Sequence, residues 1–205
     1  MIHVASRRRS RASLARAFPG ARIIDVTSRA DEPWVRLSPF YPHGGIPVPR
    51  SPGVTAWSVE GIWQALKVFE TCDVDPARLG VTAMTGLKRT VRRYGRVLGH
   101  RDGLHGERLL GYETARRRIY LPAYRWVLEN RTAGLVDRVR RLAEEGDVVL
   151  LDYTTNGDVA DLATPLSHAA LIRGYIEGRW PEEDHGEDAP GPVATDAGAE
   201  GATSR

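Results

Sequence analysis

The sequence predicts an α+β fold that is predominantly α-helical and carries a few short strands. Three observations lead to this prediction. The chain has 205 residues, of which 41% are hydrophobic and 27% charged, as is typical of a globular domain with a substantial core. A segment near residue 60 is apolar or small on nearly every side of a helix. Apolar residues also repeat with the helical period at 112–130 and 134–145.

The segment 59–70 is the predicted central helix, because Ser58 is a favourable N-cap residue and no helix breaker follows it directly. Glu60, Gln64 and Lys67 stand at i, i+4 and i+7, so they form one narrow polar stripe on this helix. A buried charge is unfavourable unless it is paired or used in chemistry. The stripe is therefore either the solvated face of the helix or a set of functional residues.

Lysine is rare in this chain: Lys67 and Lys88 are its only two lysines. Burial can lower the pKa of a lysine, whereas an arginine keeps its charge, and a neutral lysine amine is a nucleophile. The presence of one of the two lysines on an otherwise apolar helix therefore suggests a chemical role for Lys67.

The N-terminal region 1–33 is predicted to be a βαβ-like extension, with a helix at 10–18 between strands at 2–5 and 21–27. Arg7 and Arg9 fall where the first strand meets the helix, and positive charge there opposes the helix dipole. Backbone N–H groups and arginines together form anion sites, so Arg7 and Arg9 are candidate phosphate ligands. The alternative is a solvated basic turn.

Residues 28–57 are predicted to form an ordered loop over the central helix, since they are rich in proline and glycine but also contain aromatic residues. The later elements follow from N-cap signals, glycine stops and apolar spacing. They are helices beginning at Asp75-Pro76 and over about 86–94, 112–130, 134–145 and 164–178, and a buried strand over 148–153. Residues 181–205 are acidic, lack a hydrophobic pattern and predict a disordered tail.

The net charge of +3 is uneven, because the acidic tail leaves the rest of the chain more basic. A basic body favours a phosphate-bearing partner. Cys72 is the single cysteine, no apolar run approaches the ~20 residues that span a bilayer, and the N-terminal charge order differs from that of a signal peptide. We therefore expect a cytoplasmic protein without membrane contact. No His, Asp or Cys residues have the spacing of metal ligands, so neither a metal nor a cofactor is expected. The sequence leaves the oligomeric state open.

The segment Leu37-Ser38-Pro39-Phe40-Tyr41-Pro42 precedes the helix in which Glu60 is followed by glutamine at +4 and lysine at +7. These two motifs, in this order and at about this separation, resemble the NADAR (YbiA-like) family. That family includes N-glycosidases that act on riboflavin-pathway intermediates and hydrolases that remove ADP-ribose from nucleic-acid bases. The resemblance covers roughly 34–165 and implies a NADAR-like helical domain over 34–180.

The resemblance implies three catalytic residues. Lys67 would attack the sugar as a Schiff-base nucleophile, Glu60 would stabilise charge or protonate the leaving base, and Asp158 would orient the ribose hydroxyls. Two tryptophans of the family pattern are missing, one of them after the glycine–arginine pair. The candidate substitutes for base stacking are Trp63, Tyr94 and Tyr112. The implied or suggested substrate-binding residues are Phe40, Tyr41, Trp63, Gln64, Arg96, Asn156, Arg7 and Arg9.

The predicted function is therefore an N-glycosidase that cleaves the N-glycosidic bond of a ribosyl-phosphate substrate. Its partner would be a phosphate-bearing small molecule or an ADP-ribosylated nucleic acid. The alternative is a non-catalytic nucleotide- or nucleic-acid-binding module of the same fold, which the missing tryptophans and the basic body favour. A third hypothesis is a structural accessory protein of a phage or mobile element, which would bind no nucleotide.

Overall fold

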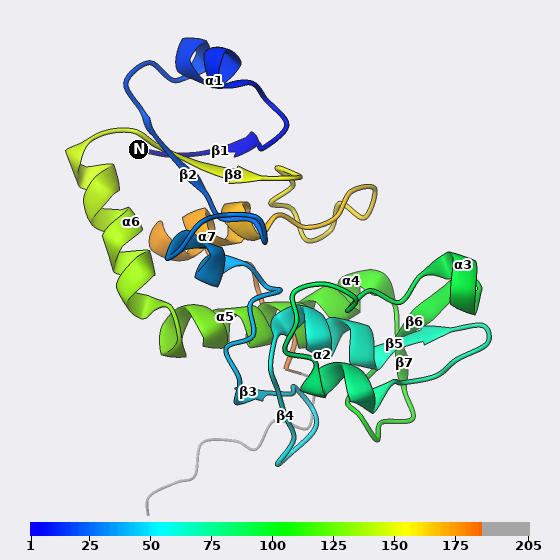
Figure 1. Cartoon of the computed structure of the whole chain (residues 1–205). Coiled ribbons are helices and arrows are strands. Elements are labelled where there is room, and N and C mark those ends of the chain that lie inside the picture. The colour runs from blue at the N-terminus through cyan, green and yellow to red at the C-terminus, as the bar shows by residue number, and fades with distance from the viewer. Residues whose placement is uncertain (186–205) are drawn as a thin grey trace, which may run out of the picture.

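The structure is a computed structural model that describes residues 1–185, so most of the predicted acidic tail at 181–205 lies outside the described residues. Small sheets and helices alternate in a mixed α/β arrangement with about 37% helix and 16% strand (Figure 1). The prediction of a predominantly α-helical α+β fold is wrong. Within the described part, no helix combines the length and the apolar character needed to cross a membrane.

A parallel sheet with the strand order β1–β8–β2 forms the upper part of the molecule in Figure 1. Its strands are β1 (Ile2–Ser6), β2 (Arg22–Asp25) and β8 (Val148–Asp152). The central strand β8 is buried along its whole length, as is usual for a parallel strand that is covered on both faces. Val149 and Leu151 pack with Leu14 of helix α1 (Arg11–Ala17), while Val148 and Leu150 alternate with them and join the main core.

The strands and the helix predicted within residues 1–33 are confirmed. Helix α1 begins after Ser10, whose hydroxyl accepts a hydrogen bond from the backbone N–H of Ser13, as expected of an N-cap residue. Because β1 and β2 lie on either side of β8, the first residues of the chain share a sheet with a strand from the far end of the fold.

Helix α2 (Val59–Leu66) lies in the lower part of the molecule, and every one of its residues is buried. Its N-cap Ser58 accepts a hydrogen bond from Gly61 N–H at 3.0 Å. A Cβ atom on Gly61 would stand 2.8 Å from the carbonyl oxygen of Arg78, so only glycine lets the neighbouring 3-10 turn (Pro76–Gly80) approach this closely.

The predicted central helix over 59–70 ends earlier than expected, at Leu66. The next residues form strand β5 (Lys67–Phe69), which belongs to a second, antiparallel sheet. Its other strands are β6 (Val97–Arg101) and β7 (Leu109–Leu110). Backbone pairing with β6 therefore overrides the local helix propensity after Leu66.

The side chain of Arg89 stabilises this transition from helix to strand. Its guanidinium donates hydrogen bonds to the carbonyl oxygens of Gln64 (3.2 Å), Lys67 (2.6 Å) and Asp73 (2.7 Å). It therefore satisfies carbonyl groups that have no partner within the helix. The helix predicted over 86–94 is shorter than expected, since only α3 (Val91–Tyr94) is helical.

The longest helical stretch joins α4 (Tyr112–Ala115) to α5 (Leu121–Asn130) through a π-helical turn, so the prediction of a helix over 112–130 is confirmed. The predicted helix at 134–145 and the predicted strand at 148–153 are confirmed as α6 and β8. The last helix, α7, is shorter than predicted. The remaining bounds are α6 (Ala133–Glu145), α7 (His168–Ile176), β3 (Ile46–Pro47), β4 (Thr55–Ala56) and a 3-10 turn at Trp34–Leu37.

We expect Arg89→Met to lower the free energy of unfolding by about 3 kcal/mol, because it leaves several buried carbonyl groups without a donor. Equilibrium urea unfolding measures this change. Arg92→Met is the matched control: Arg92 is exposed on α3, and its substitution should change the same free energy by less than about 0.5 kcal/mol. Equal effects of the two substitutions would contradict a structural role for Arg89.

Candidate functional site

A cavity of about 670 Å³, here called the central cavity, lies between the carboxyl ends of the parallel strands and helix α2. This volume suits a ligand of nucleotide size. The strand β1 leads to α1 above the sheet, whereas β8 leads towards α7 below it (Figure 1). Ligands in parallel sheets commonly bind where neighbouring strands send their connections to opposite faces. The side chains that line the cavity from these strand ends belong to Arg8, Thr27, Asp152, Tyr153 and Thr154.

The polar stripe of α2 faces the central cavity and is not solvated. Only 7% of Glu60 and 3% of Gln64 is exposed, which excludes the interpretation of the stripe as a solvated helix face. The side-chain amide of Gln64 donates to Glu60 Oε1 at 2.9 Å and accepts a hydrogen bond from Arg89 N–H at 2.9 Å. Burial raises the pKa of Glu60, and this effect outweighs the opposing effects of Gln64 and the two lysines. The carboxyl group is therefore biased towards its neutral form.

Both lysines of the chain line the central cavity. Lys67 is half-buried at the start of β5, and its Nζ lies 5.9 Å from the ring centroid of Trp63. Burial lowers the pKa of Lys67, although the nearby Glu60 carboxyl opposes the shift. Lys88 Nζ lies 5.4 Å from the ring centroid of Phe40. The cavity thus contains a carboxyl group and two amines, and the charge of Lys88 lowers the pKa of both Glu60 and Lys67.

An aromatic cluster forms one wall of the central cavity. Trp63 makes edge-to-face contacts with Tyr112 and Tyr120, at ring-centroid distances of 5.7 and 5.8 Å. His100 lies 3.8 Å from Trp63, is fully buried, and has no hydrogen-bond partner for either ring nitrogen among the described residues. Burial, assisted by the charge of Lys67, lowers the pKa of His100 to about 3, so its ring is neutral and packs against Trp63 as an aromatic group.

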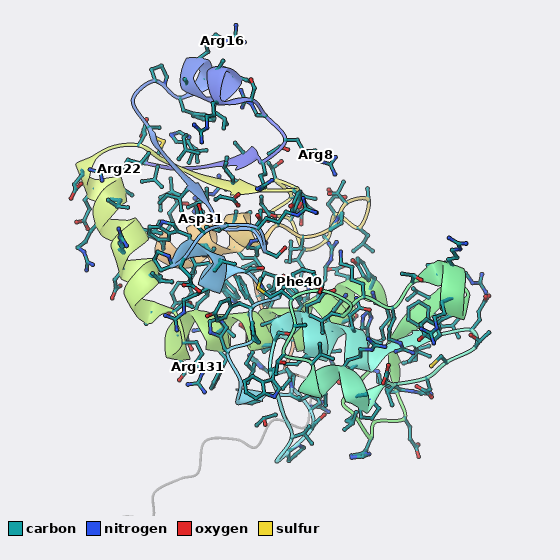
Figure 2. All side chains as sticks on the ribbon, in the orientation of Figure 1. Arg8, Arg16, Arg22, Asp31, Phe40 and Arg131 are labelled. Atoms are coloured by element: carbon teal, nitrogen blue, oxygen red, sulfur yellow. The ribbon has the colours of Figure 1, made fainter. Side chains whose placement is uncertain are left out.

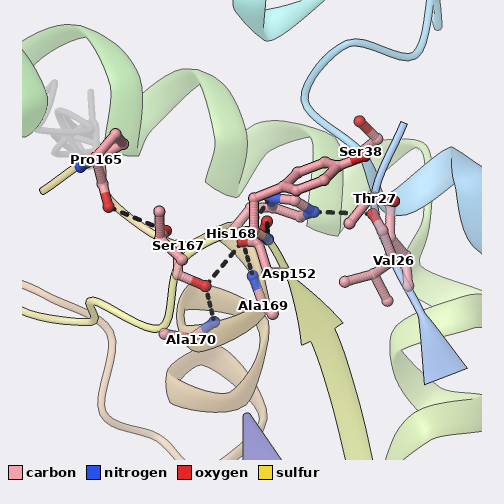
Figure 3. A network of polar contacts seen from close by, with 12 residues as sticks. Val26, Thr27, Ser38, Asp152, Pro165, Ser167, His168, Ala169 and Ala170 are labelled. Carbon is pink, nitrogen blue, oxygen red and sulfur yellow. Dashed lines mark hydrogen bonds and ion pairs between the residues drawn. The ribbon is translucent and has the colours of Figure 1, made fainter. Parts of the chain in front are cut away.

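A buried ion pair fixes the strand end on the other side of the central cavity. His168 Nδ1 lies 2.9 Å from Asp152 Oδ2, and Nε2 lies 2.8 Å from the carbonyl oxygen of Val26 (Figure 3). The Ser167 hydroxyl donates to the same carboxylate oxygen at 2.8 Å. Burial opposes both charges, but their attraction and hydrogen bonds prevail, so the pKa of His168 is raised and that of Asp152 is lowered. The pair therefore connects β8, α7 and the residue that follows β2.

Residues 6–172 of the chain match a family described as a family of unknown function (DUF6939). The chain belongs to this family. The match spans all the residues that line the central cavity, from Arg8 to His168, and it begins within β1. No curated protein and no solved structure matches the chain. The family description names no activity, so the resemblance to NADAR proteins stays a prediction.

The central cavity brings together five of the predicted site residues, which are Glu60, Lys67, Phe40, Trp63 and Gln64. They come from α2, from the first residue of β5 and from the loop predicted to lie over the central helix. The two motifs in the sequence selected Phe40, Glu60, Gln64 and Lys67, whereas Trp63 was selected as a substitute for a missing tryptophan. Lys67 reaches the cavity from a strand rather than from a helix.

The other predicted site residues do not line the central cavity. Asp158 is exposed and forms a turn in which its N–H donates to Asn156 Oδ1 at 2.8 Å. The Tyr41 hydroxyl donates to Glu32, and Arg96 is paired with Glu70 with 78% of its side chain exposed. Arg7 and Arg9 line a second cavity, as described below.

Several cavity residues were not among the predicted site residues, namely Arg8, Lys88, Arg116, Asp152 and His168. The scarcity of lysine pointed as directly to Lys88 as to Lys67, and Asp152 stands at the end of a predicted buried strand. Nothing local identifies Arg116 or His168, because their partners are distant in the sequence. Within residues 1–185, no three His, Cys, Asp or Glu side chains are grouped so that they could hold a metal ion.

The ion pair predicts a pH dependence of stability. The raised pKa of His168 contributes stability below the ordinary imidazole pKa, and this is lost as the pH rises through the folded-state value. The lowered pKa of Asp152 contributes stability above the ordinary carboxyl pKa, and this is lost as the pH falls through the folded-state value. The ion pair of Asp152 and His168 therefore stabilises the folded state most between about pH 4 and pH 6.5.

We expect Asp152→Asn to lower the free energy of unfolding by about 3 kcal/mol near pH 5.5, with a smaller loss as the pH rises. Urea unfolding at a series of pH values measures the difference. Glu145→Gln, which removes an exposed ion pair with Arg22, is the control and should change the free energy by less than about 1 kcal/mol at each pH. A loss of stability on Asp152→Asn that is the same at all pH values would show that the His168 charge plays no part.

Proposed function

We propose that the protein is an N-glycosidase that cleaves the bond between a base and the ribose of a phosphate-bearing substrate. The observation that carries the proposal is the pairing of a buried carboxyl group, Glu60, with a half-buried amine, Lys67, in one cavity. The resemblance to NADAR proteins suggests two substrate classes, which are ADP-ribosylated bases and riboflavin-pathway intermediates.

Glu60 is the proposed general acid. Cleavage of an N-glycosidic bond places negative charge on the leaving nitrogen, which a proton from a neutral carboxylic acid neutralises. Burial raises the pKa of Glu60, so a larger fraction of the side chain holds this proton near neutral pH. The hydrogen bond from Gln64 to Oε1 fixes the orientation of the carboxyl group.

Lys67 is the proposed nucleophile. Its amine forms a bond to C1 of the ribose while the C1–N bond breaks, and the electron pair of that bond leaves with the base, which takes the proton from Glu60. The secondary ammonium that results gives one proton to the Glu60 carboxylate. The nitrogen electron pair then forms the C=N bond as the C1–O bond of the ring breaks, and the ring oxygen keeps that electron pair and takes the second proton of the nitrogen, so the sugar opens to an imine. Water hydrolyses this imine, which releases the sugar and restores the amine. A lowered pKa of Lys67 favours the neutral amine that the first step requires.

The remaining cavity residues provide binding. Trp63 and Phe40 offer aromatic surface for a base, while Lys88 and Arg8 offer positive charge for phosphate groups. Arg8 has no hydrogen-bond or ion-pair partner for its side chain among residues 1–185, so its charge is available to a ligand. A cytoplasmic location is part of the proposal, and the free thiol of Cys72 suits a reducing compartment.

The second candidate is a non-catalytic nucleotide- or nucleic-acid-binding module. The position of Asp158 favours it, because this third predicted catalytic residue is exposed outside the central cavity. Binding of ADP-ribose or of a riboflavin precursor without release of a base would select this candidate over the enzyme.

We expect Lys67→Arg to abolish base release, because arginine keeps the charge but forms no imine, and Glu60→Gln to slow it by about 100-fold or more. Chromatographic detection of the free base, with ADP-ribosylated oligonucleotides and riboflavin precursors as substrates, measures both effects. Glu144→Gln on the exposed side of α6 is the control and should keep full activity. Base release by the Lys67→Arg variant would exclude the covalent mechanism.

The electrostatic basis of the proposal has its own test. Reductive methylation followed by peptide mass spectrometry gives the pH at which Lys67 becomes reactive. We expect this midpoint to lie below the ordinary lysine value of about 10.4, because burial disfavours the charged amine. Glu60→Gln should lower the midpoint further, since the Glu60 carboxylate favours the ammonium form. An ordinary midpoint that does not respond to Glu60→Gln would refute the coupling.

A further inference from the structure

A second cavity of about 770 Å³, here called the arginine cleft, lies on the face of the parallel sheet that α1 covers. Its apolar floor includes Leu14 and Leu151, which pack together beneath α1. The arginines that line it are Arg7, Arg9, Arg11 and Arg29. None of the residues assigned to the proposed chemistry lies in this cleft, so what it binds is a separate question.

The arginine cleft carries more positive than negative charge. Arg7 is neutralised by Asp25, with Nε and Oδ2 2.6 Å apart. The guanidinium of Arg9 donates only to neutral oxygens of Ser13. Arg11 and Arg29 are exposed, and in the described part of the chain neither guanidinium has a hydrogen-bond or ion-pair partner. The other acidic residue of the lining is Asp31, so three arginines face one remaining carboxylate.

Aromatic side chains also line the arginine cleft. Phe18 and Trp34 are half-buried, so part of each ring remains accessible from the cleft. The guanidinium carbon of Arg9 lies 5.7 Å from the ring centroid of Phe18. Arginines that bind phosphates and aromatic rings that stack on bases are the two components of sites for single-stranded nucleic acid. A ligand made of phosphate alone would have no use for the aromatic surface.

The three consecutive arginines Arg7, Arg8 and Arg9 lie between the two cavities. Arg7 and Arg9 line the arginine cleft, whereas Arg8 between them lines the central cavity. A polyanion bound along the cleft would therefore reach Arg8 and the mouth of the central cavity with its next phosphates. Such a ligand also gives a reason for positive charge at the start of α1, where the helix dipole disfavours it.

We propose that the arginine cleft binds single-stranded nucleic acid, with phosphates on Arg11 and Arg29 and bases against Phe18 and Trp34. The proposal goes beyond the N-glycosidase function, because Glu60 and Lys67 lie in the other cavity. The cleft would hold the strand whether or not the central cavity cleaves a base from it.

Fluorescence anisotropy with a fluorescein-labelled oligo(dT) of about 15 nucleotides tests the proposal on the full chain. We expect the double variant Arg11→Gln/Arg29→Gln to bind about tenfold more weakly at low salt. The slope of log affinity against log salt should fall by about 0.7 for each arginine removed, because each releases one phosphate contact. Wild-type protein that does not bind the oligonucleotide, or a double variant that binds like wild type, would overturn the proposal.

The matched control removes two arginines that are exposed but line neither cavity, in the variant Arg16→Gln/Arg141→Gln. Arg16 projects from α1 at the top of Figure 2 and, unlike its neighbour Ala15, does not line the cleft. This variant has the same net charge as the first and should bind like wild type. An equal loss of affinity in both double variants would indicate a general charge effect and would count against the cleft.

The bases are tested separately from the phosphates. Inorganic polyphosphate of similar total charge should compete for the protein much more weakly than unlabelled oligo(dT). Phe18→Leu, which keeps an apolar side chain on the cleft floor, should reduce this preference while leaving the salt dependence unchanged. Equal competition by polyphosphate and oligo(dT) against wild type would mean that the cleft is a general polyanion site, and the assignment to nucleic acid would fail.

Discussion

The side chain of Gln64 connects the groups on which the candidate active site depends. Its amide donates to the Glu60 carboxyl and accepts a hydrogen bond from the backbone of Arg89, whose guanidinium in turn binds the carbonyl groups of Gln64 and Lys67. One neutral amide thus orients the buried carboxyl group and positions the segment that carries Lys88. It also lies beside the point where helix α2 becomes strand β5. Partners at this depth are needed because an unsatisfied buried polar group costs free energy comparable to a lost hydrogen bond.

The central cavity lies where the carboxyl ends of the parallel strands face the polar side of helix α2. The parallel sheet ends in polar residues at the carboxyl ends of its strands, and α2 presents its polar stripe towards them. The ion pair of Asp152 and His168 holds the sheet side, and the hydrogen bonds of Arg89 hold the helix side. A rigid support on both sides is the usual requirement for a site that must hold reacting groups in a fixed geometry.

Strand β1 pairs with β8, and the residues that follow β1 therefore line both cavities. The segment after β1 directs Arg8 to the central cavity and its two neighbours to the arginine cleft. Because the family match runs from Ser6, the last residue of β1, into α7, the strands β2 and β8 and both cavities belong to one family unit. The chemistry proposed for one cavity and the binding proposed for the other therefore both rest on a single fold.

The sequence by itself determined the elements whose signals are local: the caps Ser10 and Ser58, the helix at 134–145 and the buried strand at 148–153, together with the spacing that selects Glu60 and its helix neighbours. Only the tertiary structure decided where α2 ends, because the backbone partners of β5 come from β6. It also decided that His168 joins Asp152, that Lys88 enters the cavity and that Asp158 stays outside it. These outcomes depend on contacts between residues far apart in the chain, which hydrophobic periodicity and capping signals do not encode.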